Sequence, residues 1–341
     1  MNILVVGAGF AGATIARQLA EDGHKICIID QRDHIAGNAY DYTNDHGIRV
    51  HKYGPHLFHT NNKEVFDWVT RFGEFGEYKH KVKAQLADGR YVTLPVNKET
   101  KKVVGEENII DIFYRPYTKK MWGMELEELD NSIVKRIPVR DDYNELYFPD
   151  DKFQIMPLKG YTKLFENILN HNNIVVHLNT AFDKKMEELY DHVFNSMPID
   201  VYYDYEYGEL PYRSIKFHDT HLPMNKVLPV GTVNFTHDGP YTRITEWKNY
   251  PYHGDNTNMT TLTVEEPCDY KDNDYQRFYP VKDITGENLS IYKKYAAKQV
   301  NNPNMTFIGR CGMYVYIDMH QAINSSLQTA KKFIRRHKWI T

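Results

Sequence analysis

The stretch NILVVGAGFAGATIARQLAEDG, residues 2–23, decides the fold class. Its first five residues form a continuous apolar run, which is typical of a strand buried on both faces of a parallel sheet. Gly7, Gly9 and Gly12 follow in the pattern G-x-G-x-x-G and lead into a helix-like segment that ends near Gly23. The next apolar strand, KICIID at residues 25–30, completes a βαβ unit, and we expect its crossover to be right-handed.

This glycine loop predicts a dinucleotide site. The first glycine permits a tight turn, the second lets a pyrophosphate approach the backbone, and the third lets the helix pack on the strand. The helix start, Phe10-Ala11, would add N–H groups and partial positive charge. Asp30 ends the second strand 21 residues after Gly9 (30 − 9), where an acid can bind ribose hydroxyls.

The residues after Asp30 favour FAD over NAD, the alternative dinucleotide. The segment QRDHIAGNAY, residues 31–40, extends the phosphate side of the site, as in FAD proteins of the glutathione-reductase type. NAD domains usually proceed straight to another βα unit. A strand, a glycine and a helix recur near the other end of the chain, in MTFIGR (305–310) and the segment from residue 318. A helix N-terminus there would stabilise negative charge on a reduced flavin.

Composition excludes several classes of protein. The 341 residues are 41% hydrophobic and 26% charged with a net charge of −3, which offers no basic field for nucleic acid or an anionic membrane. No apolar run approaches the ~20 residues of a membrane span. The N-terminal stretch lacks the basic start of a signal peptide. Three scattered cysteines, without metal-ligand spacing, favour a reducing cytoplasm. The 26 tyrosines decide nothing by themselves.

The remaining chain suggests insertions within a nucleotide-binding domain. We expect a helix at 61–72, a hairpin at 83–96 turning at Asp88-Gly89, and charged, helix-like sequence at 97–136. Residues 173–180 and 192–199 read as central strands, 201–295 as a mostly antiparallel sheet, and 318–337 as a closing helix. In the strand-like stretch before that helix, Tyr314 and Tyr316 would share one face.

Several uncommon strings resemble the UDP-galactopyranose mutase family, in order and over nearly the whole chain. Besides GAGFAG they are RDHIAGNAY, HKYGPHLFHT, YTKKMWG, RIPVR, FQIMPLKGYT, PYTRITEWK, YPVKD and GRCGMYVYIDMHQAI. The resemblance implies an α/β protein in three parts. These are an FAD-binding Rossmann-like domain (1–72, 159–200 and 296–341), a small helical domain (97–135), and a twisted antiparallel sheet (73–96, 136–158 and 201–295).

The resemblance also implies an isomerase that interconverts UDP-galactopyranose and UDP-galactofuranose. In that family reduced FAD acts as a nucleophile through its N5 atom, with no net redox change, so an external reductant such as NAD(P)H is needed. Covalent chemistry belongs to the cofactor, and the protein positions groups and balances charge. Accordingly we expect no Ser-His-Asp triad, no glycosidase acid pair and no metal centre.

Site residues are carried over by matching positions. The catalytic set comprises Arg140, Arg243, Tyr279, Tyr316, Asp318 and His59, in which the two arginines would bind the diphosphate. The substrate-binding set comprises Tyr117, Thr118, Trp122, Tyr147, Phe153 and Asn234. The cofactor-binding set comprises Gly7, Gly9, Phe10, Ala11, Gly12, Asp30, Gln31, Arg32, Gly37, Asn38, Tyr53, Gly54, His56, Gly309, Arg310, Tyr316, Asp318 and Met319.

Simpler interpretations stand beside these assignments. Asp318 suits a helix N-cap whatever its chemistry, and Trp122 suits helix packing. A metal site at His51, His56 and His59 is disfavoured, because a glycine-proline turn separates them without a carboxylate partner. Alternative functions are an FAD oxidoreductase of amine-oxidase-like fold, a mutase for another UDP-sugar such as N-acetylgalactosamine or arabinose, and a non-enzymatic sugar-nucleotide binder.

Three departures from the family pattern limit the transfer. Ala36 replaces a glycine, which a negative φ at that residue would tolerate. Phe153 stands where the family has tyrosine, so a hydroxyl contact to phosphate is lost or supplied by Tyr147. The segment 96–122 is much shorter than in bacterial relatives, where it forms the dimer contact. We therefore expect a monomer or a differently assembled dimer.

Overall fold

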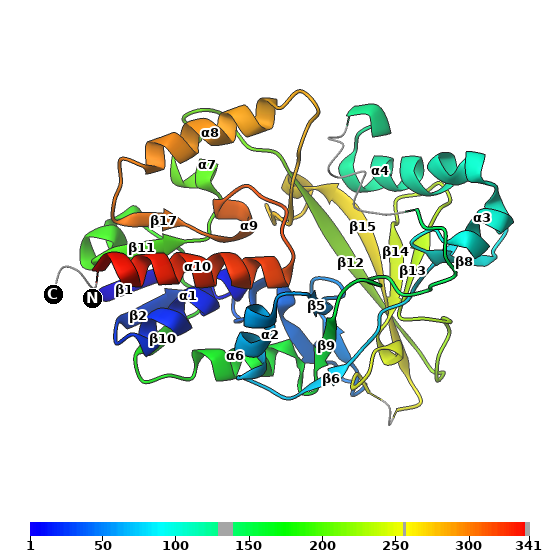
Figure 1. Cartoon of the computed structure of the whole chain (residues 1–341), viewed down its shortest axis with the longest axis horizontal. Helices are drawn as coiled ribbons and strands as arrows, with labels where there is room; N and C mark the ends of the chain where they lie inside the picture. Colours follow the sequence, from blue (N-terminus) through cyan, green and yellow to red (C-terminus); the bar gives the residue numbers. More distant parts are fainter. Residues whose placement is uncertain (129–138, 255–256, 338–341) are drawn as a thin grey trace.

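A computed structural model describes residues 1–128, 139–254 and 257–337. Figure 1 shows a parallel sheet with flanking helices at one end of the molecule, and a second sheet with a short helical segment at the other. The predicted boundary at 135/136, between the helical insertion and the antiparallel sheet, falls outside the described residues, as does part of the RIPVR string.

The parallel sheet confirms the predicted Rossmann-like fold. Its strand order is β10-β2-β1-β11-β17, and all neighbours pair in parallel. The bounds are β1 (Asn2–Val6), β2 (Lys25–Ile29), β10 (Ile174–His177), β11 (His192–Asn195) and β17 (Met305–Phe307). One prediction was wrong: β10 is an edge strand rather than a central one, and Val175 is 54% exposed.

Helices cover both faces of this sheet because alternate residues of β1 point to opposite sides. Ile3 and Val5 pack in one core cluster with α1 (Phe10–Glu21), α6 (Gly160–Leu169) and α10 (Met319–His337). Leu4 and Val6 belong to a second cluster with α7 (Ile199–Tyr202) and α8 (Glu287–Gln299). Helix α8 therefore joins the parallel sheet, although it begins within the range assigned from sequence to the antiparallel sheet. The long helix α10, red in Figure 1, lies beside α1.

The second sheet has seven strands in the order β16-β12-β15-β14-β13-β7-β8. The bounds are β7 (Val82–Gln85), β8 (Tyr91–Leu94), β12 (Tyr212–Leu222), β13 (Thr232–Phe235), β14 (Arg243–Glu246), β15 (Thr260–Asp269) and β16 (Tyr279–Pro280). All pairs are antiparallel except β13 with β7. The predicted hairpin is confirmed as β7–β8, with Gly89 at φ +87° in its turn.

Small elements join the two sheets. Strands β3 (Asp41–Thr43) and β4 (Arg49–His51) form a ribbon, and β5 (Phe58–Thr60), β6 (Phe75–Glu77) and β9 (Phe153–Pro157) form a three-stranded sheet. The helix predicted at 61–72 is α2 (Lys63–Thr70), capped by the Asn62 side chain, which accepts from the N–H groups of Glu64 and Val65.

The helical insertion holds α3 (Lys98–Val104), a π-helical turn (Ile110–Tyr114) and α4 (Arg115–Trp122), which packs against β15. None of the helices among the described residues has the length and apolar character that a membrane crossing requires.

The stretch after β17 differs from the prediction. A short helix, α9 (Gly309–Gly312), is followed by a loop in which Tyr314 has φ +45°. The Tyr314 hydroxyl is buried within 2.7 Å of the Val281 carbonyl oxygen, whereas Tyr316 lines a cavity. The two tyrosines do not share a face, because the chain here is not a strand.

Candidate active site

The glycine loop is closely packed. A Cβ atom on Gly12 would lie 1.9 Å from the Gly7 carbonyl oxygen, so only glycine lets α1 start against β1. A Cβ atom on Gly37 would lie 2.8 Å from the Gly9 Cα, and Gly37 has φ +55°. The loop after β1 and the loop after β2 therefore meet backbone to backbone, as a site for a pyrophosphate requires.

Asp30 connects the loop after β1 to the loop after β2. Its carboxylate accepts from the N–H of Ala8 at 2.8 Å and from the N–H of Arg32 at 3.0 Å. The Arg32 guanidinium donates to the Asn38 side-chain oxygen at 3.0 Å and lies 4.5 Å from the centroid of the Tyr53 ring. These contacts connect the end of β2 to Asn38 and Tyr53, which both line a cavity.

Ala36 does not have the negative φ that would make it a neutral replacement for glycine. Its φ is +73°, in the left-handed region, and its side chain is buried. A left-handed conformation costs an L-residue about 1–2 kcal/mol. The Ala36 N–H donates to the Ala8 carbonyl oxygen at 3.0 Å, so the strained residue joins the two loops.

These loops fit a dinucleotide cofactor. Helix α1 begins at Phe10-Ala11, and its N-cap residue, Gly9, has no side chain to cap the first N–H groups. Those groups are therefore available to a phosphate. Gly309, with φ +71°, brings the start of α9 against Ala11, where a Cβ on Gly309 would lie 3.2 Å from the Ala11 Cβ. Gln31 follows β2 at the surface, next to Asp30.

A cavity of about 380 Å³ lies between the start of α10 and one face of the antiparallel sheet. Residues from all three parts of the chain line it. Those predicted from sequence are Asn38, Tyr53, Gly54, His56, His59, Tyr117, Trp122, Tyr147, Asn234, Arg243, Tyr279, Arg310, Tyr316, Asp318 and Met319. Those that the sequence reasoning missed are Pro55, Leu57, His80, Val82, Phe148, Thr232, Glu265 and Phe278.

Arg243, on β14, is one of the cations that line this cavity. Glu265 lies directly opposite it on β15, and its carboxylate is 3.0 Å from the Arg243 Nε. Burial opposes the charge on Arg243, yet Glu265 and the neighbouring phenols outweigh it and raise the pKa of the guanidinium. Burial also raises the pKa of Glu265, and Arg243 opposes that rise. The guanidinium is thus a fixed, permanent positive charge facing the cavity.

Aromatic rings and a second guanidinium also line the cavity. The Arg310 guanidinium lies 5.3 Å from the Tyr279 ring centroid and 5.1 Å from that of Tyr316. It donates to the carbonyl oxygens of Phe278 at 2.9 Å and Ile317 at 2.6 Å, which fix its position. Trp122 meets the rings of Tyr279 and Tyr316 edge-on, each at 6.4 Å. Such a wall can hold a planar ring or a sugar.

Arg140 is placed differently from Arg243. Its guanidinium donates to the carbonyl oxygens of Leu146 at 2.9 Å and Asn144 at 3.0 Å, and it does not line the cavity. It therefore braces the loop that carries Tyr147, which does line the cavity.

Two predicted substrate residues also lie off the cavity wall. Phe153 stacks on Phe66 at 4.0 Å, and Thr118 is buried on α4. Of the two residues considered for the phosphate contact, only Tyr147 borders the cavity.

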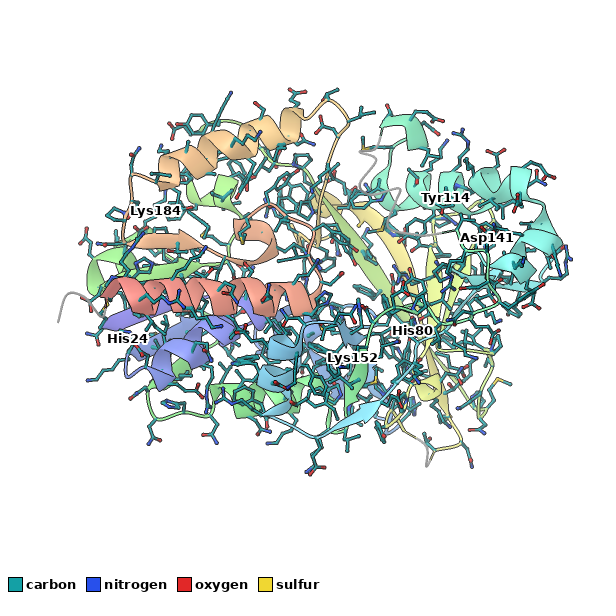
Figure 2. All side chains as sticks on the ribbon, viewed as in Figure 1. His24, His80, Tyr114, Asp141, Lys152 and Lys184 are labelled. Atoms are coloured by element: carbon teal, nitrogen blue, oxygen red, sulfur yellow. The ribbon has the colours of Figure 1, made fainter. Side chains whose placement is uncertain are left out.

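Two histidines that line the cavity, His56 and His80, are neutral groups. Burial, Arg243 and His59 lower the pKa of His80 to about 3, and burial lowers that of His56 to about 4 despite its bond to the Gly54 carbonyl. His80, just before β7, lies in the half of the molecule formed by the antiparallel sheet (Figure 2). His51 is 3.0 Å from His253, nitrogen to nitrogen, and accepts from the His56 N–H at 3.0 Å. His51 thus supports the loop and does not face the cavity.

His59, on β5, is held by two neighbours. Its Nδ1 is 2.5 Å from the Asp151 carboxylate, and its ring stacks on Phe148 at 3.6 Å. Across from it, Asp318 immediately precedes α10, and its N–H donates to the Gln321 side-chain oxygen at 2.9 Å. That bond is one half of a capping box, so Asp318 stands at the helix N-cap position and also borders the cavity.

Two family models and two relatives of known name match this chain. The sequence model of a family described as UDP-galactopyranose mutase matches residues 112–316, and that of an NAD(P)-binding Rossmann-like domain matches residues 5–72. A dTDP-fucopyranose mutase of Escherichia coli is 38% identical, with 99% of each chain covered. A probable UDP-galactopyranose mutase of Klebsiella pneumoniae is 37% identical over 98% of this chain and 94% of its own.

A solved structure of a reduced UDP-galactopyranose mutase superposes with a TM-score of 0.76 at 15% identity. The match covers 98% of this chain and 95% of the other. At that identity the likeness shows the fold alone.

Proposed function

The chain belongs to the UDP-galactopyranose mutase family, and we propose that it interconverts UDP-galactopyranose and UDP-galactofuranose without net redox change. One observation carries the proposal. Arg243 on β14, whose positive charge Glu265 stabilises, and Arg310 on α9, which lies against the rings of Tyr279 and Tyr316, line the same cavity. A nucleoside diphosphate sugar presents the charges and rings that such walls bind.

FAD is the cofactor of this family, and the packed loops at Gly9, Gly37 and Gly309 fit it. When bound in reduced form, it supplies the nucleophile, its N5 atom, for the anomeric carbon of the sugar. The remaining tasks belong to the protein: binding the nucleotide, retaining the departing diphosphate, and excluding water from the opened sugar. Arg32 and Asn38 would hold the phosphate side of the cofactor, and Arg310 and Met319 its ring side.

Arg243 would bind the diphosphate and retain it while the sugar rearranges. A guanidinium fork matches phosphate oxygens in two directions, and the Glu265 carboxylate, 3.0 Å from Nε, stabilises its charge. Tyr117 lies beside it, with its hydroxyl 3.5 Å from the Arg243 Nη2. Tyr117 and Trp122 offer faces for the base, and Asn234 on β13 is paired in register with Arg243.

Tyr279, Tyr316, Asp318 and His59 would surround the sugar. Burial raises the pKa of Tyr279, so its hydroxyl stays protonated and can donate to a phosphate oxygen. Asp151 binds the Nδ1 atom of His59 and fixes the ring. The other ring nitrogen, Nε2, therefore points away from Asp151. Arg140 would act by holding the loop that carries Tyr147. Tyr147, rather than Phe153, would supply the phosphate hydroxyl contact.

The test is turnover with chemically reduced enzyme. FAD-loaded protein reduced with dithionite should convert UDP-galactofuranose to UDP-galactopyranose, separated by chromatography, while the flavin stays reduced. Oxidation of the flavin in step with oxidation of the substrate would instead support an FAD oxidoreductase. Binding of UDP with no exchange of isomers would support a non-enzymatic binding protein.

A second candidate substrate is a dTDP-sugar. The Escherichia coli relative named dTDP-fucopyranose mutase is as similar to this chain as the Klebsiella pneumoniae relative is. The same assay with dTDP-fucopyranose and with UDP-linked N-acetylgalactosamine and arabinose decides between them. The substrate with the highest kcat/KM identifies the physiological sugar class.

A further inference from the structure

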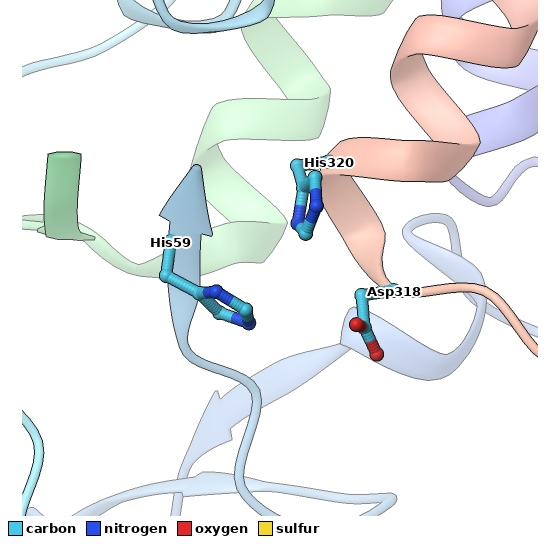
Figure 3. A group of neighbouring side chains, drawn as sticks. All are labelled: His59, Asp318 and His320. Atoms are coloured by element: carbon cyan, nitrogen blue, oxygen red, sulfur yellow. The ribbon is translucent and has the colours of Figure 1, made fainter. Parts of the chain in front are cut away.

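Three metal-binding side chains meet at the edge of the cavity although they are far apart in sequence. His59 comes from β5, and Asp318 and His320 come from the start of α10. One ligand atom from each lies within 4.8 Å of the other two (Figure 3). All three residues are partly accessible, so an ion can reach them.

The spacing suits a small divalent ion. Zinc binds imidazole nitrogen at about 2.0–2.1 Å and carboxylate oxygen at about 2.0–2.2 Å, so neighbouring ligands of a tetrahedral ion are about 3.4 Å apart. Small rotations of the side chains would close the gap from the present spacing. Two nitrogens and one oxygen favour Zn²⁺ and related transition metals over Mg²⁺ and Ca²⁺, which prefer oxygen alone.

The residue behind His59 supports this assignment. The Asp151 carboxylate lies 2.5 Å from the His59 Nδ1 and also accepts from the Asn61 amide at 2.9 Å. In metal-binding histidines, the nitrogen that does not face the metal almost always donates to a carboxylate, a backbone carbonyl or a water. Stacking on Phe148, with ring planes 11° apart, further restricts the His59 ring. The nitrogen left for the ion is therefore preoriented.

His320 faces His59 from the first turn of α10. Its ring meets that of His59 edge-on, with centroids 5.0 Å apart. The carboxylates of Asp318 and Asp151 add negative charge around the two imidazoles, which a divalent cation would balance.

We propose that His59, Asp318 and His320 bind one divalent transition-metal ion of the Zn²⁺ class, which holds the start of α10 to β5 and slows turnover. The binding itself is independent of the proposed function. The effect on turnover rests on it, because Asp318 is a residue that would face the sugar.

The binding test is a calorimetric titration of FAD-loaded, tag-free protein with ZnCl₂, and with MgCl₂ in parallel. Zn²⁺ should occupy one site, and Mg²⁺ should give no comparable signal. His320→Asn and Asp318→Asn should each weaken Zn²⁺ binding at least tenfold, and His320→Gln repeats the test if the first variant does not fold. The matched control is His221→Asn, because His46 and His221 form another neighbouring pair, with ring centroids 4.7 Å apart.

Unchanged affinity in the His320 and Asp318 variants would overturn the site, as would an equal loss in His221→Asn. In the turnover assay, Zn²⁺ should slow the reduced enzyme reversibly, with recovery on adding EDTA. His320→Asn should lose a smaller fraction of its own metal-free rate. Equal fractional losses of rate in the parent and in His320→Asn would refute the effect on turnover. A metal-free enzyme without isomerase activity would count against the proposed function. The metal site would still be tested by the calorimetric titration.

Discussion

The lowered pKa of His80 should make the free energy of unfolding of this protein depend on pH. Its pKa is lowered from 6.5 to about 3 in the folded protein, because it is buried and faces Arg243 and His59. The unfolded chain therefore takes up a proton below pH 6.5 that the folded protein refuses until about pH 3. The free energy of unfolding should fall as the pH drops through this window, at up to about 1.4 kcal/mol per pH unit.

Between pH 7 and pH 5 this single group should lower the free energy of unfolding by about 2 kcal/mol. His80→Gln keeps a polar side chain of similar reach but does not titrate. The variant should therefore lose about 2 kcal/mol less than the parent protein between these two pH values. Other buried histidines, such as His51 and His253, contribute equally to both proteins and cancel in the comparison.

The measurement is urea unfolding of FAD-saturated protein at both pH values, followed by circular dichroism. His221→Gln, which removes an exposed histidine, is the matched control and should follow the parent. If the parent and His80→Gln lose the same stability between pH 7 and pH 5, His80 is not the neutral, buried group described here.

Three further changes test the cofactor loops and the charged pair. Gly37→Ala should weaken FAD binding at least tenfold in a flavin fluorescence titration, since its Cβ would lie 2.8 Å from the Gly9 Cα. Gly47→Ala, at φ +73° with open space around it, is the control, and equal effects would contradict the reasoning. Glu265→Gln should destabilise the protein by about 3 kcal/mol in urea, because it removes the buried carboxylate that offsets the charge of the partly buried Arg243. Additive effects of Glu265→Gln and Arg243→Met in the double variant would argue against the pair. Arg243→Ala should weaken UDP binding at least tenfold by calorimetry. Arg140→Ala should weaken it less and should mainly lower the melting temperature. A larger loss of UDP affinity in Arg140→Ala than in Arg243→Ala would refute the placement of Arg140.

Local patterns predicted much of the fold. The β1–α1–β2 unit, α2, the β7–β8 hairpin and α10 each depend on periodicity, caps or turn residues within a short window. The position of β10 could not be predicted this way, because an apolar run shows that a strand is buried and not which neighbours it has. The conformation of Ala36 was likewise hidden, since the two loops that force it left-handed are brought together only by the fold.

The candidate site divides in the same way. Family strings pointed to Arg243, Arg310, Tyr279 and Tyr316, which the structure brings to one cavity. Glu265 was missed because it is one of two adjacent acids in TVEEP, and only the register of β14 with β15 tells which one faces Arg243. The group of His59, Asp318 and His320 was missed for a stronger reason, because no spacing in the sequence relates β5 to α10.

The order in which the parallel sheet is assembled has a consequence for biosynthesis. Strands β1 and β2 leave the ribosome early, but β17 begins at Met305, 276 positions after Ile29, the last residue of β2 (305 − 29), and α10 follows it. At typical translation rates this leaves the nascent N-terminal segment without its final strand and helix for roughly 15 to 55 seconds. During that interval the apolar side of α1 that later meets α10 is a natural target for chaperones, and cofactor loading has to wait for nearly the whole polypeptide.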